Sequence, residues 1–199
     1  MSTDVADGLT FTDEDWYGEE LGSRTFTDCT FRDVDLTEAT SAGATFTACR
    51  FEHSRLNASR HAATAFVGCH FLRTNLFDAE LDGCKLTGSV FVDCVLRPLT
   101  VRGGVWRGVT LRGARLTGLD LSGLQLVEAD LSEADLSDTD LQGADLTGAT
   151  VRGTRLRGTD LRRATLDRVD LSVARLEDTR LDLAGAVRLA EARGALVEP

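Results

Sequence analysis

Lysine, proline and aromatic residues are all scarce in this chain of 199 residues, which has two prolines and only 6% aromatic side chains. No apolar run approaches the roughly 18 residues of a membrane helix. The first residues, MSTDVADG, have neither the basic nor the apolar part of a signal peptide. We therefore expect a cytoplasmic protein with no membrane segment.

Basic residues are outnumbered as well, with 22 Lys and Arg against 32 Asp and Glu, for a formal net charge of −10. Proteins that bind nucleic acid directly usually carry a net basic face, which argues against that class here. The same balance argues against docking on an anionic membrane surface.

What the sequence has in abundance is a repeat with a period of five residues. Counting in fives from Phe11 to Leu181 gives 35 positions, and all except Ser41 and His61 are large and apolar. The position two residues earlier is mostly small from Cys29 onward. A period of five matches neither a helix nor a strand. It favours a chain that turns once per unit, with one large and one small side chain pointing inward.

Units such as ADLSE (129–133) and ADLTG (144–148) resemble the pentapeptide-repeat family over about residues 11–181. The resemblance implies an all-β solenoid, a right-handed quadrilateral β-helix with four units in each coil. At a strand spacing of ~4.8 Å, roughly nine coils make a rod about 42 Å long. We expect an acidic N-terminal extension (1–10), the β-helix (11–181), and a short C-terminal capping helix with a tail (182–199).

Two groups of inward-pointing residues are candidates for a catalytic or metal-binding site: the pair Ser41 and His61, and the five cysteines. Ser41 and His61 lie one coil apart on one face, so we expect them either to turn outward or to find partners inside. The five cysteines all occupy the small inward position and fit no CxxC pattern. We expect buried thiols that act as small hydrophobes, with no metal and no cofactor. A rod also lacks the concave pocket of most enzymes, so we expect a binding protein.

Charge is distributed unevenly along the repeat. Arg97, Arg102, Arg107 and Arg112 each follow a core position on successive faces, which predicts a basic belt around one coil. Residues 116–151 then contain eight acids and no base. From this stretch and its surroundings we predict an acidic partner-binding surface that consists of Glu80, Asp120, Asp130, Asp135, Asp140, Asp145 and Asp160.

Asp120, Asp140 and Asp160 are predicted to form a line of outward-pointing carboxylates one coil apart, with Glu80 two coils before Asp120. Like charges at this spacing repel, so a line of this kind costs stability unless a partner uses it. Alternatively, each aspartate is an ordinary part of the repeat and bonds the local backbone. An acidic rod of about duplex width would attract a protein with a basic DNA-binding channel, as a DNA mimic would.

Four stretches resemble the fluoroquinolone-resistance subgroup of the family, the MfpA-like proteins, with the Qnr and AlbG proteins more distant: FTDEDW (11–16), SRHAATAF (59–66), GSVFVDCVLRPLT (88–100) and the C-terminal tail. The resemblance implies a homodimeric DNA mimic that binds DNA gyrase, a type II topoisomerase, lowers its activity and protects it from quinolones. The alternative is a pentapeptide-repeat scaffold with a partner other than a topoisomerase.

After Leu181 the five-residue frame stops, and Asp182 and Gly194 predict the two ends of a helix. A solenoid end exposes unpaired strand edges and core side chains and must be covered. The helix is either the cap of a monomer or, as the resemblance favours, a cap that also joins two rods end to end. Leu183, Ala186, Val187 and Ala190 fall at i, i+3, i+4 and i+7 and form an apolar stripe on this helix. We assign the dimer interface to the residues of this stripe and to two residues of the tail: Leu183, Ala186, Val187, Ala190, Leu196 and Val197.

Overall fold

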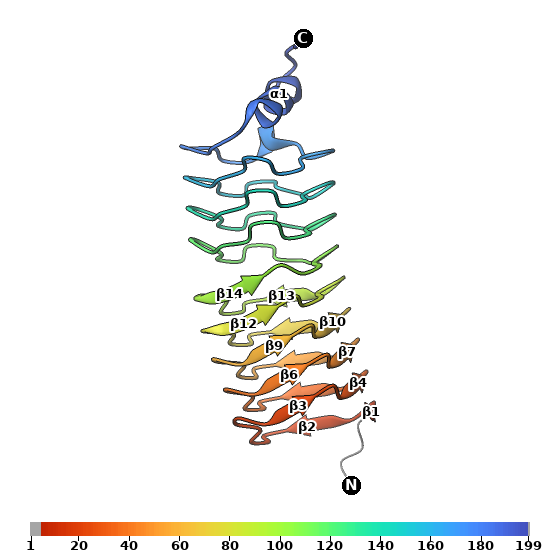
Figure 1. The fold of residues 1–199 in the computed structure, drawn as a ribbon. Helices are drawn as coiled ribbons and strands as arrows, with labels where there is room; N and C mark the ends of the chain where they lie inside the picture. Colours follow the sequence, from red (N-terminus) through yellow and green to blue (C-terminus); the bar gives the residue numbers. More distant parts are fainter. Residues whose placement is uncertain (1–4, 199) are drawn as a thin grey trace.

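The computed structural model describes residues 5–198, which form a rod with Val5 and the C-terminal helix at opposite ends (Figure 1). Neighbouring coils pair in parallel with a register of 20 residues, from Val5–Thr25 at one end to Asp160–Arg180 at the other. Four five-residue units therefore complete one coil. The predicted fold class, a right-handed quadrilateral β-helix with a short C-terminal helix, is confirmed.

Named strands occupy the first half of the rod and lie on three of its four faces. They are β1 (Val5–Asp7), β2 (Thr10–Thr12), β3 (Glu20–Gly22), β4 (Thr25–Thr27), β5 (Thr30–Arg32), β6 (Thr40–Ala42), β7 (Thr45–Thr47), β8 (Arg50–Glu52), β9 (Arg60–Ala62), β10 (Ala65–Val67), β11 (His70–Leu72), β12 (Ala79–Asp82), β13 (Val90–Val92) and β14 (Leu99–Arg102). The sheets run β1-β4-β7-β10, β13-β11-β8-β5-β2 and β14-β12-β9-β6-β3. The fourth face, and all faces beyond β14, are joined by single bridges.

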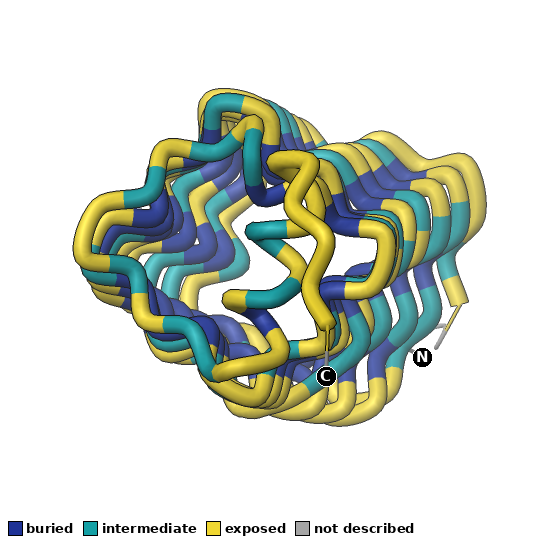
Figure 2. Tube along the Cα trace, turned by 90° about the horizontal axis from the view of Figure 1, so that it is seen from above, coloured by how far each residue is buried: buried dark blue, intermediate teal, exposed yellow. Residues whose placement is uncertain are grey.

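The core is the inside of the rod, filled by the five-residue frame. Buried positions recur at the same places on successive coils (Figure 2). In the first half, phenylalanines stack in columns, with ring centroids 4.7 Å apart for Phe31–Phe51 and 4.8 Å for Phe51–Phe71. These distances equal the coil spacing, so each ring packs on its counterpart one coil away. Leucine fills the equivalent positions later in the chain.

Ser41 and His61 are the polar exceptions in this core, and both find partners inside. Ser41 Oγ lies 2.6 Å from His61 Nδ1 and 2.7 Å from Thr64 Oγ1. His61 Nε2 lies 3.1 Å from Ser59 Oγ. Burial lowers the pKa of His61 to about 4, so the ring is neutral at pH 7.

This buried histidine predicts a pH dependence of stability. The ordinary pKa of histidine is 6.5. Between pH 6.5 and 4, His61 is therefore protonated in the unfolded chain but neutral in the folded protein. Stability should be complete above pH 6.5 and fall by about 3 kcal/mol as the pH approaches 4. Urea unfolding of wild type and His61→Leu across this range measures the effect, because leucine already fills the equivalent position, Leu81. Parallel pH profiles for the two proteins would contradict the assignment.

The N-terminal boundary predicted at residue 11 is wrong over the described residues. β1 pairs with β4 in regular register, so residues 5–10 already belong to the first coil and not to an extension. Phe11 and Trp16 are only partly buried there, because no earlier coil covers them. Residues 1–4, the remainder of the predicted extension, lie outside the described residues.

At the other end, η1 (Leu171–Val173) and helix α1 (Leu183–Ala192) follow the last complete coils. Asp182 caps α1 as predicted: its carboxylate accepts from Gly185 N–H at 2.9 Å and from Arg163 N–H at 2.7 Å, which ties the helix to the rod. Gly194, with φ +87°, ends the helix as predicted. No helix in residues 5–198 is long and apolar enough to cross a membrane.

The hydrogen-bonded ladder is interrupted between two coils on two adjacent faces. On one face, bridges reach Val95 and resume from Arg115 to Asp135; on the next, β12–β14 pairing ends at Arg102 and bridging resumes at Asp120. In the described chain, no backbone hydrogen bond joins 93–103 to 112–123. The other two faces continue without a break, as in Lys85–Val105–Gln125.

Two sequence features flank this interruption. Pro98 occupies the corner position at which nearly every other unit has a positive φ, its peptide bond to Arg97 is cis, and it has no N–H to donate. Gly104 has φ +117°, and a Cβ there would collide with the carbonyl oxygen of Cys84. Only glycine lets the chain return to regular pairing at this point.

Candidate partner-binding surface

The aspartates of the predicted acidic surface lie on the faces of the coils, one residue before a core leucine and just before the corner that follows it. Each carboxylate accepts a hydrogen bond from the backbone N–H two residues later: Asp120 from Ser122 at 3.0 Å, Asp130 from Ser132 at 2.9 Å, Asp140 from Gln142 at 2.8 Å and Asp145 from Thr147 at 3.0 Å. The carboxylates are therefore folded back along the coil surface, where they stabilise the corner.

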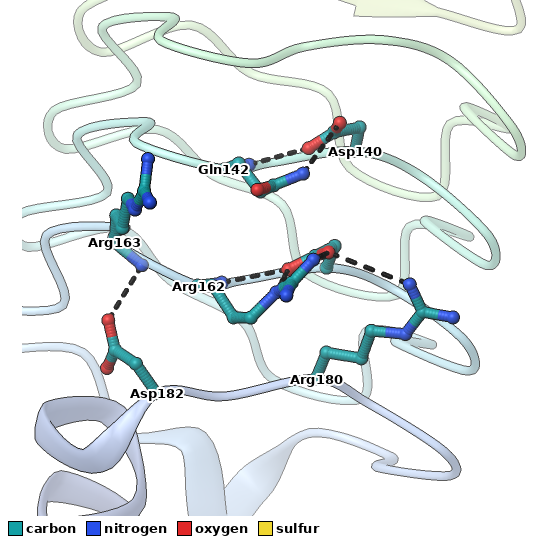
Figure 3. Close-up of polar contacts among 7 residues, drawn as sticks. Asp140, Gln142, Arg162, Arg163, Arg180 and Asp182 are labelled. Atoms are coloured by element: carbon teal, nitrogen blue, oxygen red, sulfur yellow. Dashed lines mark hydrogen bonds and ion pairs between the residues drawn. The ribbon is translucent and has the colours of Figure 1, made fainter.

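Asp160 does not point outward, so its predicted orientation is wrong. The residue is only 7% exposed. Arg162 donates to its carboxylate from Nη2 at 2.6 Å and from Nε at 2.9 Å, and Arg180 Nη1 lies 3.9 Å away (Figure 3). The hydrogen bond from Arg162 holds the pKa of Asp160 below its usual value. Its charge is therefore largely neutralised by two arginines.

Several other acids of the base-free stretch are paired with arginines one coil away. Glu128 binds Arg107 at 3.0 Å, Glu133 binds Arg112 at 2.6 Å, Asp135 lies 3.7 Å from Arg155, and Asp138 lies 3.7 Å from Arg157. The arginine belt is thus partly neutralised by the next coil. A spacing of 19 to 21 residues between acid and base, equal to one coil, is the signal in the sequence that would have revealed these pairs.

Glu80 is separated from the other acids, because Thr100 occupies its register position in the next coil. It binds Arg60 at 3.2 Å and Arg102 at 3.1 Å. The hydrogen bonds from Arg102 and Arg60 lower the pKa of Glu80. The interruption in the ladder also lies between Glu80 and Asp120.

Four carboxylates of the predicted surface have no arginine within 4.0 Å in the described chain: Asp120, Asp130, Asp140 and Asp145. We call these four the open carboxylate surface. Asp120 and Asp140 are bridge partners on one face, and Asp145 and Asp130 follow on the next two faces. This surface is the part of the acidic prediction at which charge is available to a partner.

The C-terminal helix covers the rod with a different face from the predicted apolar stripe. Gly185 is buried, and Leu189 packs against the core. A Cβ on Gly185 would lie 3.0 Å from Leu181 Cδ2, so the helix approaches closely because this residue is glycine. The spacing of Gly185 and Leu189, four residues apart, is a helical pattern that the stripe omitted.

The predicted dimer residues remain mostly uncovered in the single chain. Leu183 is 82% exposed, Leu196 96% and Val197 43%. Ala186 is exposed, while Val187 and Ala190 are half-buried. Apolar side chains that are this exposed at the end of a rod are available for a contact with a second molecule.

The cysteines are free thiols, four of them buried and Cys94 partly so. Burial raises the pKa of Cys84 to about 11, so this thiol stays protonated at pH 7. Within residues 5–198, no group of three or more histidine, cysteine, aspartate or glutamate side chains is arranged to hold a metal ion.

A coiled, four-sided rod with one large and one small inward residue per unit defines a class of repeat β-solenoids. A family model for pentapeptide repeats matches residues 26–60, 62–93, 111–148 and 144–182. The chain belongs to the pentapeptide-repeat family.

Among solved structures, the chain is similar to full-length QnrB1, described as a plasmid-mediated fluoroquinolone resistance protein. The identity is 18%, with 96% of this chain and 100% of that chain covered and a TM-score of 0.63. A trypsin-treated M102R form of QnrB1 is 21% identical, with 98% and 97% coverage and a TM-score of 0.62. These matches show a shared fold. No curated protein sequence matches the chain.

Proposed function

We propose that this protein is a DNA mimic that binds DNA gyrase, inhibits it and protects it from quinolone-type poisons. The observation that carries the proposal is the open carboxylate surface, which presents unpaired negative charge on three successive faces of a regular rod. Asp120 and Asp140 are bridge partners on adjacent coils, which places two of these charges at the strand spacing of ~4.8 Å. A basic channel that holds duplex DNA attracts such an array by the same long-range field that attracts phosphates.

Two further observations support the choice of partner. The fold is shared with QnrB1, a protein described as conferring fluoroquinolone resistance. The resemblance of residues 88–100 to the fluoroquinolone-resistance subgroup adds a local signal. We place the action in the cytoplasm, as that of a binding protein with no catalytic role.

A gyrase assay with the purified protein tests this function. The protein should inhibit DNA supercoiling and reduce the double-strand cleavage that gyrase accumulates with a fluoroquinolone. Inhibition should weaken as salt rises, because the attraction is screened. If neither activity changes at micromolar protein, the proposal fails.

A scaffold with a partner other than a topoisomerase is the second candidate, and one observation favours it. Many acids are neutralised by arginines, and the others bond their own corners, as expected of a repeat surface without a charged partner. A protein of this kind would leave gyrase unaffected at low salt.

We further propose that two rods join end to end through residues 182–197. Leu183→Glu with Val187→Glu should convert the dimer to a monomer, because charges would replace exposed apolar side chains in the contact. Light scattering of the purified protein measures the mass. Ala184→Glu is the matched control, since Ala184 is exposed on the same helix but outside the stripe. A wild-type monomer at micromolar concentration would refute the assembly.

Such a dimer would be long enough to act on a duplex-binding channel. Two rods of about 42 Å span about 85 Å, or roughly 25 base pairs at 3.4 Å each. The open carboxylate surface lies in the C-terminal half of each rod, so the two copies would face the centre of the assembly.

A further inference from the structure

The interruption in the ladder leaves a groove between two coils. Its volume is about 940 Å³, and residues 91–98 line one side and 112–119 the other. Phe91, Leu96 and Leu119 are nearly buried beneath it, and Cys94 is half-buried. The groove therefore opens onto the apolar core of the rod, at a place where every regular coil is closed by its neighbour.

Each wall of the groove has a short bridging segment between turns, at Val95–Leu96 on one side and at Arg115 on the other, and its backbone groups have no hydrogen-bond partner across the groove. Regular bonds join the coil of Val95 to the coil before it: Leu76 N–H donates to Val95 O at 2.8 Å, and Val95 N–H donates to Thr74 O at 3.1 Å. The equivalent bonds one coil later, from Leu96 to Arg115 and from Arg115 to Cys94, are not formed in the described chain. Such edges are suited to pairing with an added strand.

The charged side chains that line the groove favour a negatively charged ligand. Arg97, Arg112 and Arg115 line it, and Asp93 is its one acid. Arg112 is bound to Glu133, whereas neither Arg97 nor Arg115 has a carboxylate within 4.0 Å among residues 5–198. On a chain of net charge −10, this is a local site for an anion.

Exposed apolar side chains continue the groove onto the surface. Val95 is 46% exposed, Val92 is 44% exposed, and Phe77 is 49% exposed. Phe77 lies beside the groove, because the next residue, Asp78, donates its N–H to Pro98 O at 2.7 Å. Basic and apolar groups therefore stand next to each other along the same edge.

We propose that this groove binds an extended segment of a partner protein in which acidic side chains alternate with apolar ones. The backbone of the segment pairs with the unbonded groups of Cys94 and Leu96 on one wall and of Arg115 on the other. Its carboxylates bind Arg97 and Arg115, and its apolar side chains lie over Leu96, Leu119 and Phe91. The site is separate from the open carboxylate surface and has the opposite charge, so it extends the proposed function and does not depend on it.

Fluorescence anisotropy with labelled octapeptides, in which Asp or Glu alternates with Val, Leu or Phe, tests the proposal. At least one peptide should bind the full chain at micromolar concentration, and Arg97→Gln with Arg115→Gln should weaken it at least tenfold. Arg152→Gln with Arg175→Gln is the matched control, since both arginines are exposed on other coils. Hydrogen–deuterium exchange should show the amides of Leu96 and Arg115, which are unbonded in the free protein, protected by the bound peptide.

Two further probes, an N-methylated peptide and single-stranded DNA, test whether the groove recognises a paired peptide backbone or any ligand of negative charge. A peptide N-methylated at alternate residues cannot pair its backbone and should bind at least tenfold more weakly. Equal binding of that peptide, equal competition by single-stranded DNA, or equal loss in the control variant would overturn the proposal. So would the absence of binding by every octapeptide at millimolar concentration.

Discussion

Replacing Asp120, Asp130, Asp140 and Asp145 with asparagine is expected to abolish inhibition of gyrase while the rod stays folded. An asparagine oxygen accepts the same corner hydrogen bond, as Asn75 does from Phe77 N–H at 3.0 Å. The substitution therefore removes charge and preserves the local structure. At about 0.7 kcal/mol for each of the four charges, the loss of inhibition amounts to about 100-fold. A supercoiling titration at low salt measures it.

The paired acids provide the control for this experiment. Glu128→Gln, Glu133→Gln, Asp135→Asn and Asp138→Asn remove the same number of charges at positions that arginines already neutralise. This variant should lose much less inhibition. Equal losses would mean that gyrase senses only the total charge, and full inhibition by the first variant would refute the assignment of the surface.

Leu136→Asp is expected to unfold most of the C-terminal half of the rod at room temperature. Leu136 is 1% exposed and lies among leucines of its own and adjacent coils. The change removes buried apolar contacts and places a carboxylate where no partner is available, at a cost of about 5 kcal/mol. Small domains have total stabilities of about 5–15 kcal/mol, so a loss of this size is severe. Thermal unfolding followed by circular dichroism measures it.

Thr150→Asp is the matched control, because Thr150 is exposed and pairs with Asp130 at the equivalent position one coil earlier. It adds the same charge outside the core and should change the melting temperature by only a few degrees. If Leu136→Asp melts like Thr150→Asp, the inward assignment of the five-residue frame is incorrect.

The inward positions could be predicted because a single period relates every unit to the next. Leu136 and Phe51 occupy the same place in different five-residue units, so one rule assigns them both. The same rule failed for Asp160, since it has the same register position as Asp120 yet is covered by Arg162 and Arg180. Position in the repeat determines where a side chain begins, whereas the neighbours one coil away determine where its charged end lies.

The groove could not be predicted for a related reason. Leu96 and Val101 keep the apolar frame unbroken, so the pattern of core residues continues through the interruption. The cause lies in the backbone, at Pro98 and at the glycines that follow it. Likewise, the helix covers the rod with Gly185 and Leu189, because only the position of the last coil decides which face of a short helix meets the core.

The interruption between residues 93–103 and 112–123 also bears on how the rod unfolds. In a solenoid each coil is stabilised only by its two neighbours, so cooperativity passes along the rod from one interface to the next. The interface between the two coils at the groove lacks the ladder on two of its faces. It therefore has fewer backbone hydrogen bonds than an interface with an unbroken ladder. We therefore expect the phenylalanine-rich half and the leucine-rich half to behave as two coupled folding units, with equilibrium unfolding through a state in which one half is intact.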